Sequence, residues 1–87
     1  GTAPLAEGRL WQAEDGKLAV LLANYSDSEI PFTWRVDPAR YGVKGGVYTL
    51  SSIAPEGAAT LGAATGAIER TEKLGARQLR VIEIGVR

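Results

Sequence analysis

The clearest pattern along this 87-residue chain is a pair of strand-like runs on either side of a turn rich in Asp and Gly. In the segment Arg9–Tyr25, the run Leu10–Ala13 precedes the turn Glu14–Lys17 and the apolar run Leu18–Ala23 follows it. Gly16 can adopt the positive φ that closes such a turn, so the pattern predicts a β-hairpin. Both faces of Leu18–Ala23 are apolar, and we therefore expect this strand in the middle of a sheet with both faces covered.

The next strand-like segment, Glu29–Asp37, alternates between apolar and polar residues most regularly. Its apolar positions are Ile30, Phe32, Trp34 and Val36. Alternation with period two puts these side chains on one face, so Trp34 is expected to be buried. The following segment, Asp37–Gly42, predicts a single helical turn that crosses between sheets, because Asp37 can cap it and Pro38 fits its first position.

Later segments repeat the alternation of short strands and turns. The strands expected from the whole chain are Gly8–Ala13, Lys17–Tyr25, Glu29–Asp37, Val47–Ile53, Ala58–Leu61, Ala67–Leu74 and Gln78–Ile84. The charged strand Ala67–Leu74 is expected near a sheet edge. In Gln78–Ile84 the apolar residues change face, which favours a bulge or a strand covered on both sides. Seven such strands predict an all-β fold, a two-sheet antiparallel immunoglobulin-like β-sandwich. A closed barrel of five or six strands is the alternative.

The domain organisation follows from length and from the amino end. A chain of 87 residues is expected to form one domain, residues 8–87. The chain contains no methionine and starts with Gly1, so we interpret residues 1–7 as a tag remnant and linker. A β-domain excised from a larger protein is expected to be an accessory module.

Composition narrows the classes of partner. Ten basic and ten acidic residues cancel, which argues against nucleic acid as a partner. The longest purely apolar run, Leu18–Ala23, is far shorter than a spanning helix, so no membrane role is expected. The chain has no Cys and no His, which excludes disulfides and thiolate metal sites, and we expect no cofactor.

Several carboxylates are candidates for catalysis or metal binding. Glu14 and Asp15 resemble a pair of catalytic carboxylates, but a hairpin tip offers nothing to desolvate one of them as a general acid. Asp27 and Glu29 could contribute to a calcium site, although calcium needs more oxygen ligands. The late acidic residues Glu69, Glu72 and Glu83 alternate with basic ones and predict cross-strand ion pairs on a wet face. We therefore expect no enzymatic activity from this chain and no catalytic or metal-binding residue.

Two further features bear on partners. The triplet Asn24-Tyr25-Ser26 matches the pattern for N-glycosylation, which is a common coincidence. Exposed aromatic side chains can stack on sugar rings or dock on a protein, and the candidates for an interface or ligand contact are Trp11, Tyr25 and Tyr41.

Four ordered segments carry a resemblance to a known domain type. They are Leu10–Val20 with its Trp and Asp-Gly hairpin, Ala23–Asp27, Ala39–Gly42, and the closing segment Leu74–Ile84. Together they resemble the carboxy-terminal all-β domain that follows the catalytic barrel in many glycoside hydrolases. In that family the catalytic carboxylates lie in the barrel, so the resemblance transfers no catalytic residue to this chain.

The resemblance implies a non-catalytic accessory domain that packs on the upstream catalytic barrel of the same polypeptide and stabilises it. A carbohydrate-binding module that uses exposed aromatics to hold polysaccharide is the first alternative, and a protein-interaction or adhesion module is the second. A patch of aliphatic residues with one Trp would favour docking. Coplanar exposed aromatics with polar neighbours would favour sugar binding.

Overall fold

A computed structural model describes residues 5–87, so residues 1–4 of the expected tag remnant and linker lie outside the described part of the chain. The structure is all-β, with one 3₁₀ turn, η1, at Pro38–Tyr41. Its seven strands are β1 Ala6–Gln12, β2 Leu18–Asn24, β3 Ile30–Val36, β4 Val47–Ala54, β5 Gly57–Thr65, β6 Ile68–Leu74 and β7 Leu79–Val86. β1 begins two residues earlier than expected, so Ala6 and Glu7 belong to a strand and not to a linker.

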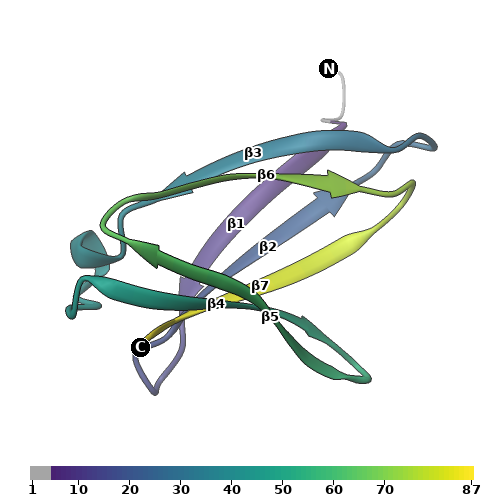
Figure 1. Ribbon diagram of the computed structural model, residues 1–87. Coiled ribbons are helices and arrows are strands. Elements are labelled where there is room, and N and C mark those ends of the chain that lie inside the picture. The colour runs from purple at the N-terminus through teal and green to yellow at the C-terminus, as the bar shows by residue number, and fades with distance from the viewer. Residues whose placement is uncertain (1–4) are drawn as a thin grey trace.

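The strands form two antiparallel sheets, which confirms the predicted sandwich. Five strands pair in the order β1-β2-β7-β4-β5, and β3 pairs with β6 in a second sheet that lies across the first (Figure 1). The division is five and two, whereas immunoglobulin constant domains divide four and three. Since the two sheets remain separate in residues 5–87, the barrel alternative is not formed.

The hairpin that joins β1 and β2 closes as its sequence predicts. The N–H of Gly16 donates to the carbonyl of Ala13, and the N–H of Ala13 donates to the carbonyl of Lys17. Gly16 has φ of 88°, the left-handed conformation needed after a type I turn in a three-residue hairpin loop. β2 lies between β1 and β7 with both faces largely covered, as expected from its apolar run.

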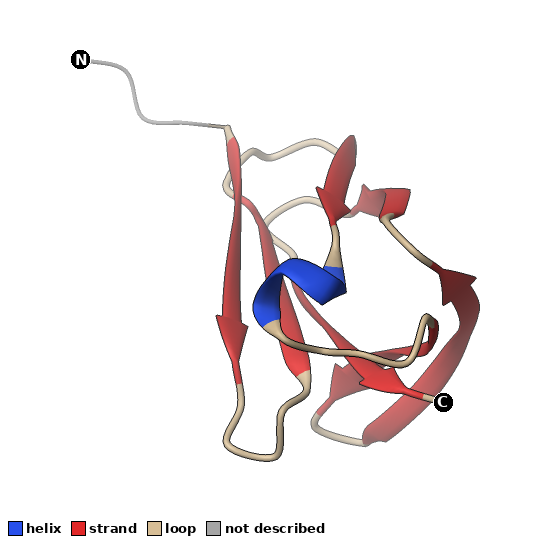
Figure 2. Cartoon of the chain, turned by 90° about the vertical axis from the view of Figure 1, so that its left-hand side faces the viewer, coloured by secondary structure: helices blue, strands red, loops and turns tan. Residues whose placement is uncertain are grey.

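The connector η1 also has the predicted form and lies at one end of the sandwich (Figure 2). Asp37 accepts a hydrogen bond from the N–H of Ala39, Pro38 occupies the first turn, and Gly42 ends it with φ of 79°. Because β3 and β4 belong to different sheets, this turn carries the chain from one layer to the other.

One expectation about the later strands was wrong. β5 runs for nine residues, Gly57–Thr65, where only Ala58–Leu61 was expected. Of the two alternatives for the last strand, the bulge is not formed, because the register of β7 with its neighbours is unbroken. A bulge lies instead between β4 and β5, where the register shifts between Leu50 and Ser51. The charged strand β6 is an edge strand, as predicted.

The core fills the space between the sheets. Twelve buried side chains form one cluster: Leu18, Val20, Leu22, Trp34, Val36, Val43, Tyr48, Leu50, Ile68, Leu74, Ile82 and Ile84. Trp34 is 7% exposed, which confirms its predicted burial. The phenol of Tyr48 donates to the carbonyl of Val43 over 2.9 Å and anchors the chain after η1 to β4.

Candidate functional site

The three aromatic candidates are exposed but lie apart. Trp11, Tyr25 and Tyr41 are 46%, 44% and 47% exposed. Trp11 lies opposite Ala19 in the sheet, and Tyr25 follows the end of β2 six residues further along, a separation of roughly 20 Å. Tyr41 belongs to η1, at the end of the sandwich. The fold therefore does not assemble these side chains into one aromatic platform.

Trp11 instead joins a set of aliphatic side chains on the outer face of the five-stranded sheet. Register places Leu21, Val81 and Ile53 in one row across β2, β7 and β4. Leu79 lies two residues before Val81 on β7 and therefore on the same face, and Trp11 lies diagonal to Leu21 across β1 and β2. We call these five residues the outer strip. Leu79 is 65% exposed, and Trp11 and Ile53 are exposed as well.

Charged pairs border the outer strip at both ends of the sheet. Glu7 and Arg9 of β1 form an ion pair with a distance of 3.0 Å between Oε1 and Nε. Lys17 pairs with Glu83 over 3.3 Å at the other end. An apolar centre with a polar border is the usual composition of a protein-binding surface.

Tyr25 adjoins the Glu7 end of this face. Partial burial and the neighbouring Glu7 carboxylate both raise the pKa of the Tyr25 phenol, while Arg9 lowers it. The phenol is therefore neutral at physiological pH and lies beside the Glu7 carboxylate at the edge of the outer strip.

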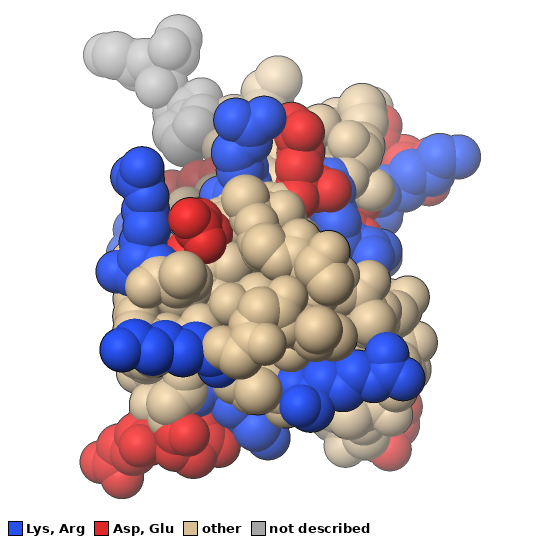
Figure 3. All heavy atoms as spheres, turned by 60° about the vertical axis from the view of Figure 1, so that its left-hand side comes forward, with Lys and Arg blue, Asp and Glu red and all other residues tan. Residues whose placement is uncertain are grey.

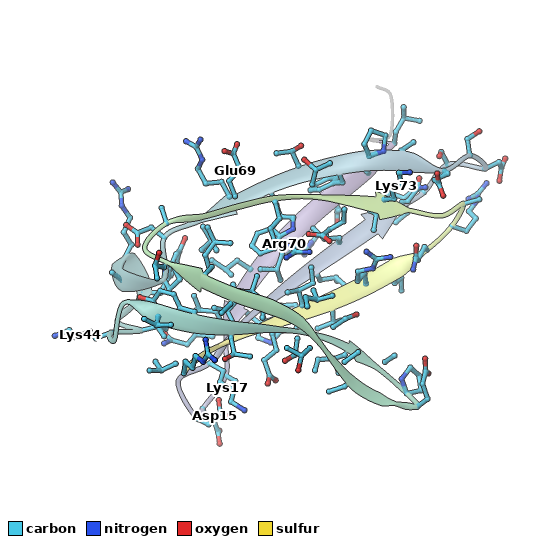
Figure 4. All side chains as sticks on the ribbon, in the orientation of Figure 1. Asp15, Lys17, Lys44, Glu69, Arg70 and Lys73 are labelled. Atoms are coloured by element: carbon cyan, nitrogen blue, oxygen red, sulfur yellow. The ribbon has the colours of Figure 1, made fainter. Side chains whose placement is uncertain are left out.

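A buried polar cluster lies between the sheets and was not foreseen. The Glu72 carboxylate, 4% exposed, accepts hydrogen bonds from Trp34 Nε1 and Arg70 Nε, each over 2.9 Å. Arg80 of β7 lies 3.7 Å from the same carboxylate. Figure 4 shows Arg70 between the sheets and Glu69 on the outer side of β6. The prediction that Glu72 lies on a wet face is therefore wrong, because β6 points this residue inward together with Ile68 and Leu74.

The charge state of Glu72 is set by these partners. Burial by itself raises the pKa of the carboxyl, but hydrogen bonds from Arg70 and Trp34 and the charges of Arg70 and Arg80 lower it further, with a net decrease. The cluster is thus ionised and fully hydrogen-bonded, and it closes the β6 side of the core. One signal in the sequence pointed to it: Arg70 and Glu72 are two residues apart, so they share the inner face of a strand.

The glycosylation triplet is used structurally. Asn24 is 1% exposed, and its Nδ2 donates to the carbonyls of Ser28, Leu74 and Gly75. Its Oδ1 accepts from the backbone N–H and the hydroxyl of Ser26. In the folded domain this side chain has no free atom for attachment of a glycan, and it instead ties the end of β2 to the turn after β6.

Asp15 and Asp27 are engaged in local structure, and Glu14 and Glu29 are exposed. Asp15 lies at the exposed hairpin tip and accepts from the N–H of Lys17. Asp27 pairs with Arg77 over 2.8 Å, so this carboxylate is occupied by a guanidinium. Within residues 5–87, no three His, Cys, Asp or Glu side chains are grouped so that they could hold a metal ion.

The end of the sandwich that carries η1 shows neutral surface bordered by Lys and Arg side chains (Figure 3). A shallow hollow of about 480 Å³ lies there, lined in part by Lys17, Val43, Lys44 and Val86. Asp15 lines it as well, so side chains of both charges are present. We assign no ligand to this hollow.

A second hollow is more apolar. It lies between β1 and β3, has a volume of about 250 Å³, and is lined by side chains of the core, including Leu10, Val20, Leu22, Phe32 and Trp34.

No helix among residues 5–87 has the length and apolar character that crossing a bilayer requires.

The chain was compared with known proteins in three ways. No family model matches it, no curated protein matches it, and no solved structure matches it.

Proposed function

We propose that this chain is a non-catalytic accessory β-sandwich of a larger carbohydrate-active enzyme, and that it docks on the catalytic barrel of the same polypeptide through the outer strip. The observation that carries the proposal is the composition of this face. Trp11 is accompanied there by Leu21, Val81, Ile53 and Leu79 rather than by further exposed aromatics. One Trp among aliphatic side chains suits protein docking, where a few large anchors provide most of the binding energy.

Sugar binding is less well supported by the same face. Stacking on consecutive sugar rings needs several coplanar aromatics with hydrogen-bonding neighbours. Trp11 and Tyr25 lie at different ends of β2, and Tyr41 lies on η1. The side chains nearest to Trp11 across the sheet are Ala19 and, diagonally, Leu21.

The choice of a glycoside hydrolase barrel as partner rests on the resemblance of the four sequence segments described above. The first test is therefore the sequence encoded immediately upstream of this chain. The proposal expects a catalytic barrel with paired carboxylates there. Another class of protein upstream would overturn the assignment of the partner.

The second test separates docking from sugar binding. Trp11 is exposed and Trp34 is buried, so a stacked oligosaccharide would change mainly the fluorescence of Trp11. We expect the fluorescence of the chain to remain flat on titration with soluble oligosaccharides. A saturable change that disappears in Trp11→Ala would replace the docking proposal with a carbohydrate-binding function.

A further inference from the structure

The small sheet is open at both edges, but only its β3 edge adjoins an apolar hollow. β3 pairs with β6 and with no other strand of residues 5–87, so each of the two strands has a free edge. A two-stranded sheet is marginal by itself and gains stability from a third strand. On the β6 side the Glu72 cluster fills the interior with paired polar groups. On the β3 side the interior opens into the apolar hollow of about 250 Å³, which we call the β1–β3 groove.

The backbone of β3 offers hydrogen-bonding groups to this groove. Pro31 has no N–H to give to β6, and the hydroxyls of the facing residues Thr33 and Thr71 approach to 2.8 Å. Both features are typical of non-hydrogen-bonded pairs, in which the facing side chains are closest and the backbone groups point away from the partner strand. Thr33 and Arg35 therefore direct their N–H and C=O groups to the free edge.

The opposite wall of the groove, β1, is likewise an edge strand among residues 5–87. The N–H of Tyr25 donates to the carbonyl of Leu5, and the N–H of Ala13 donates to the carbonyl of Lys17, at the two ends of the β1–β2 ladder. Because bonded pairs alternate along an antiparallel ladder, Gly8 and Leu10 direct their backbone groups away from β2. In the described part of the chain, backbone groups without a strand partner thus line both sides of an apolar floor.

The shape of the floor suits an extended chain. The Phe32 ring packs against the backbone of Gly8, where a Cβ would lie only 3.3 Å from it, so the ring forms part of the floor between β1 and β3. The volume is below the range of about 300–1,000 Å³ typical of small-molecule pockets. Every second side chain of a bound extended peptide would enter this narrow groove, which suits a peptide better than a compact small molecule.

Positively charged side chains at the rim of the groove indicate that acidic residues flank the apolar side chains of the bound segment. Arg9 and Arg35 both line the groove, and their side chains are 71% and 72% exposed. Their ion pairs with Glu7 and Glu69 are solvent-exposed, and such pairs contribute little and exchange readily. Two exposed guanidiniums at the rim complement acidic residues of an incoming segment.

We propose that the β1–β3 groove is a strand-acceptor site, in which an extended segment of a partner protein, with alternating apolar side chains and acidic flanks, adds to the free edge of β3. The main-chain hydrogen bonds of Thr33 and Arg35 hold its backbone, and its apolar side chains cover Leu10, Val20 and Phe32. Such strand addition is a recurring mode of peptide recognition. The groove lies on the inner side of β1 and the outer strip on its outer side, and Arg9, at the edge of the sheet, borders both.

The test uses this chain labelled with ¹⁵N and the probe peptide acetyl-Glu-Val-Thr-Val-Thr-Val-Glu-amide. We expect saturable shifts of the Thr33 and Arg35 amide resonances and a change in Trp34 fluorescence. Arg35→Gln should weaken binding several-fold and reduce its salt dependence, while Arg87→Gln serves as the charge-matched control and should leave binding unchanged. Shifts confined to other strands, or no saturable shift, would overturn the proposal.

Two peptides methylated on backbone nitrogens separate strand addition from simple apolar contact. One carries N-methyl groups on the Val residues and the other on the Thr residues, so each blocks one edge of the added strand. Strand addition predicts that one peptide binds and the other does not. Equal binding of both peptides would overturn the proposal. Shifts of the Thr33 and Arg35 amide resonances that depend on protein concentration in the absence of peptide would also overturn it, because they would assign the groove to a second copy of the chain.

Discussion

At the scale of single residues, Trp34 combines two functions in the core. Its ring packs between the sheets, and its indole N–H donates to the buried Glu72 carboxylate. Trp34→Ala should reduce the free energy of unfolding by about 3–5 kcal/mol, the range for deletion of a large buried aromatic. Trp34→Phe keeps most of the ring but removes the donor, and it should cost about 1–3 kcal/mol. Urea unfolding followed by circular dichroism measures both, and a loss below about 1 kcal/mol for Trp34→Ala would contradict its burial.

Glu72 makes stability depend on pH. Its pKa is lower in the folded domain than in the unfolded chain, so the folded state prefers the ionised form. The resulting stability is complete above the unfolded pKa of about 4.3 and is lost as the pH falls through the lower folded pKa. Glu72→Gln removes this titration, so unfolding free energies measured from pH 6 down to pH 2 should fall less steeply than in the wild type.

The control for this experiment is Glu69→Gln, since Glu69 forms only an exposed pair with Arg35. Its pH profile should follow that of the wild type. Parallel profiles for wild type and Glu72→Gln would show that Glu72 is not ionised against Arg70 and Arg80 in the folded state.

At the scale of elements, the bulge in the β4–β5 hairpin depends on one glycine. The register shifts after Leu50, which pairs with Gly62, and Leu61 is left as the extra residue on β5. Gly62 has φ of 147°, a conformation nearly restricted to glycine. Gly62→Ala should therefore cost about 1–3 kcal/mol. Gly85→Ala in β7 is the matched control, because its Cβ would meet only the flexible side chain of Lys17 at 3.5 Å or more, and it should be close to neutral. Thermal unfolding of both variants tests the difference, and equal Tm values would contradict a strained bulge.

The elements that could be predicted are those with strong local chemistry. The Asp-Gly turn at Gly16, the capped connector at Asp37 and the alternation that buries Trp34 each depend on neighbouring residues alone. The length of β5 could not be predicted, because its small Ala and Gly residues show almost no alternation of apolar and polar side chains.

The Glu72 cluster was missed for a different reason. Trp34 and Glu72 are 38 residues apart, and only the β3–β6 register brings them together. The alternation of side chains within one strand does not indicate which strand pairs with it, so the acceptor of the Trp34 indole N–H could not be predicted from the sequence. The outer strip likewise depends on the strand order β2-β7-β4, which unites Leu21, Val81 and Ile53.

At the scale of the whole molecule, we predict that this chain hydrolyses no glycoside. Glu14 and Asp15 lie at an exposed turn, and Glu72 is neutralised by Arg70 and Arg80. None of them pairs with a second carboxylate across an open cleft, as a glycosidase requires. Assays with nitrophenyl glycosides should therefore show no turnover. Activity that survives repurification and is lost in Glu72→Gln or Asp15→Asn would contradict this expectation.

The outer strip is proposed to dock this domain on the region that precedes it. The most direct measurement is the affinity between this chain and the separately produced polypeptide region encoded immediately upstream, by isothermal titration calorimetry. Trp11→Ala removes the largest side chain of the outer strip and should reduce the affinity roughly 5- to 30-fold, or about 1–2 kcal/mol. Tyr41→Ala is the matched control, since Tyr41 is as exposed as Trp11 but belongs to η1, and it should leave the affinity unchanged. Equal affinities of wild type and Trp11→Ala, or a loss confined to Tyr41→Ala, would contradict docking through this face.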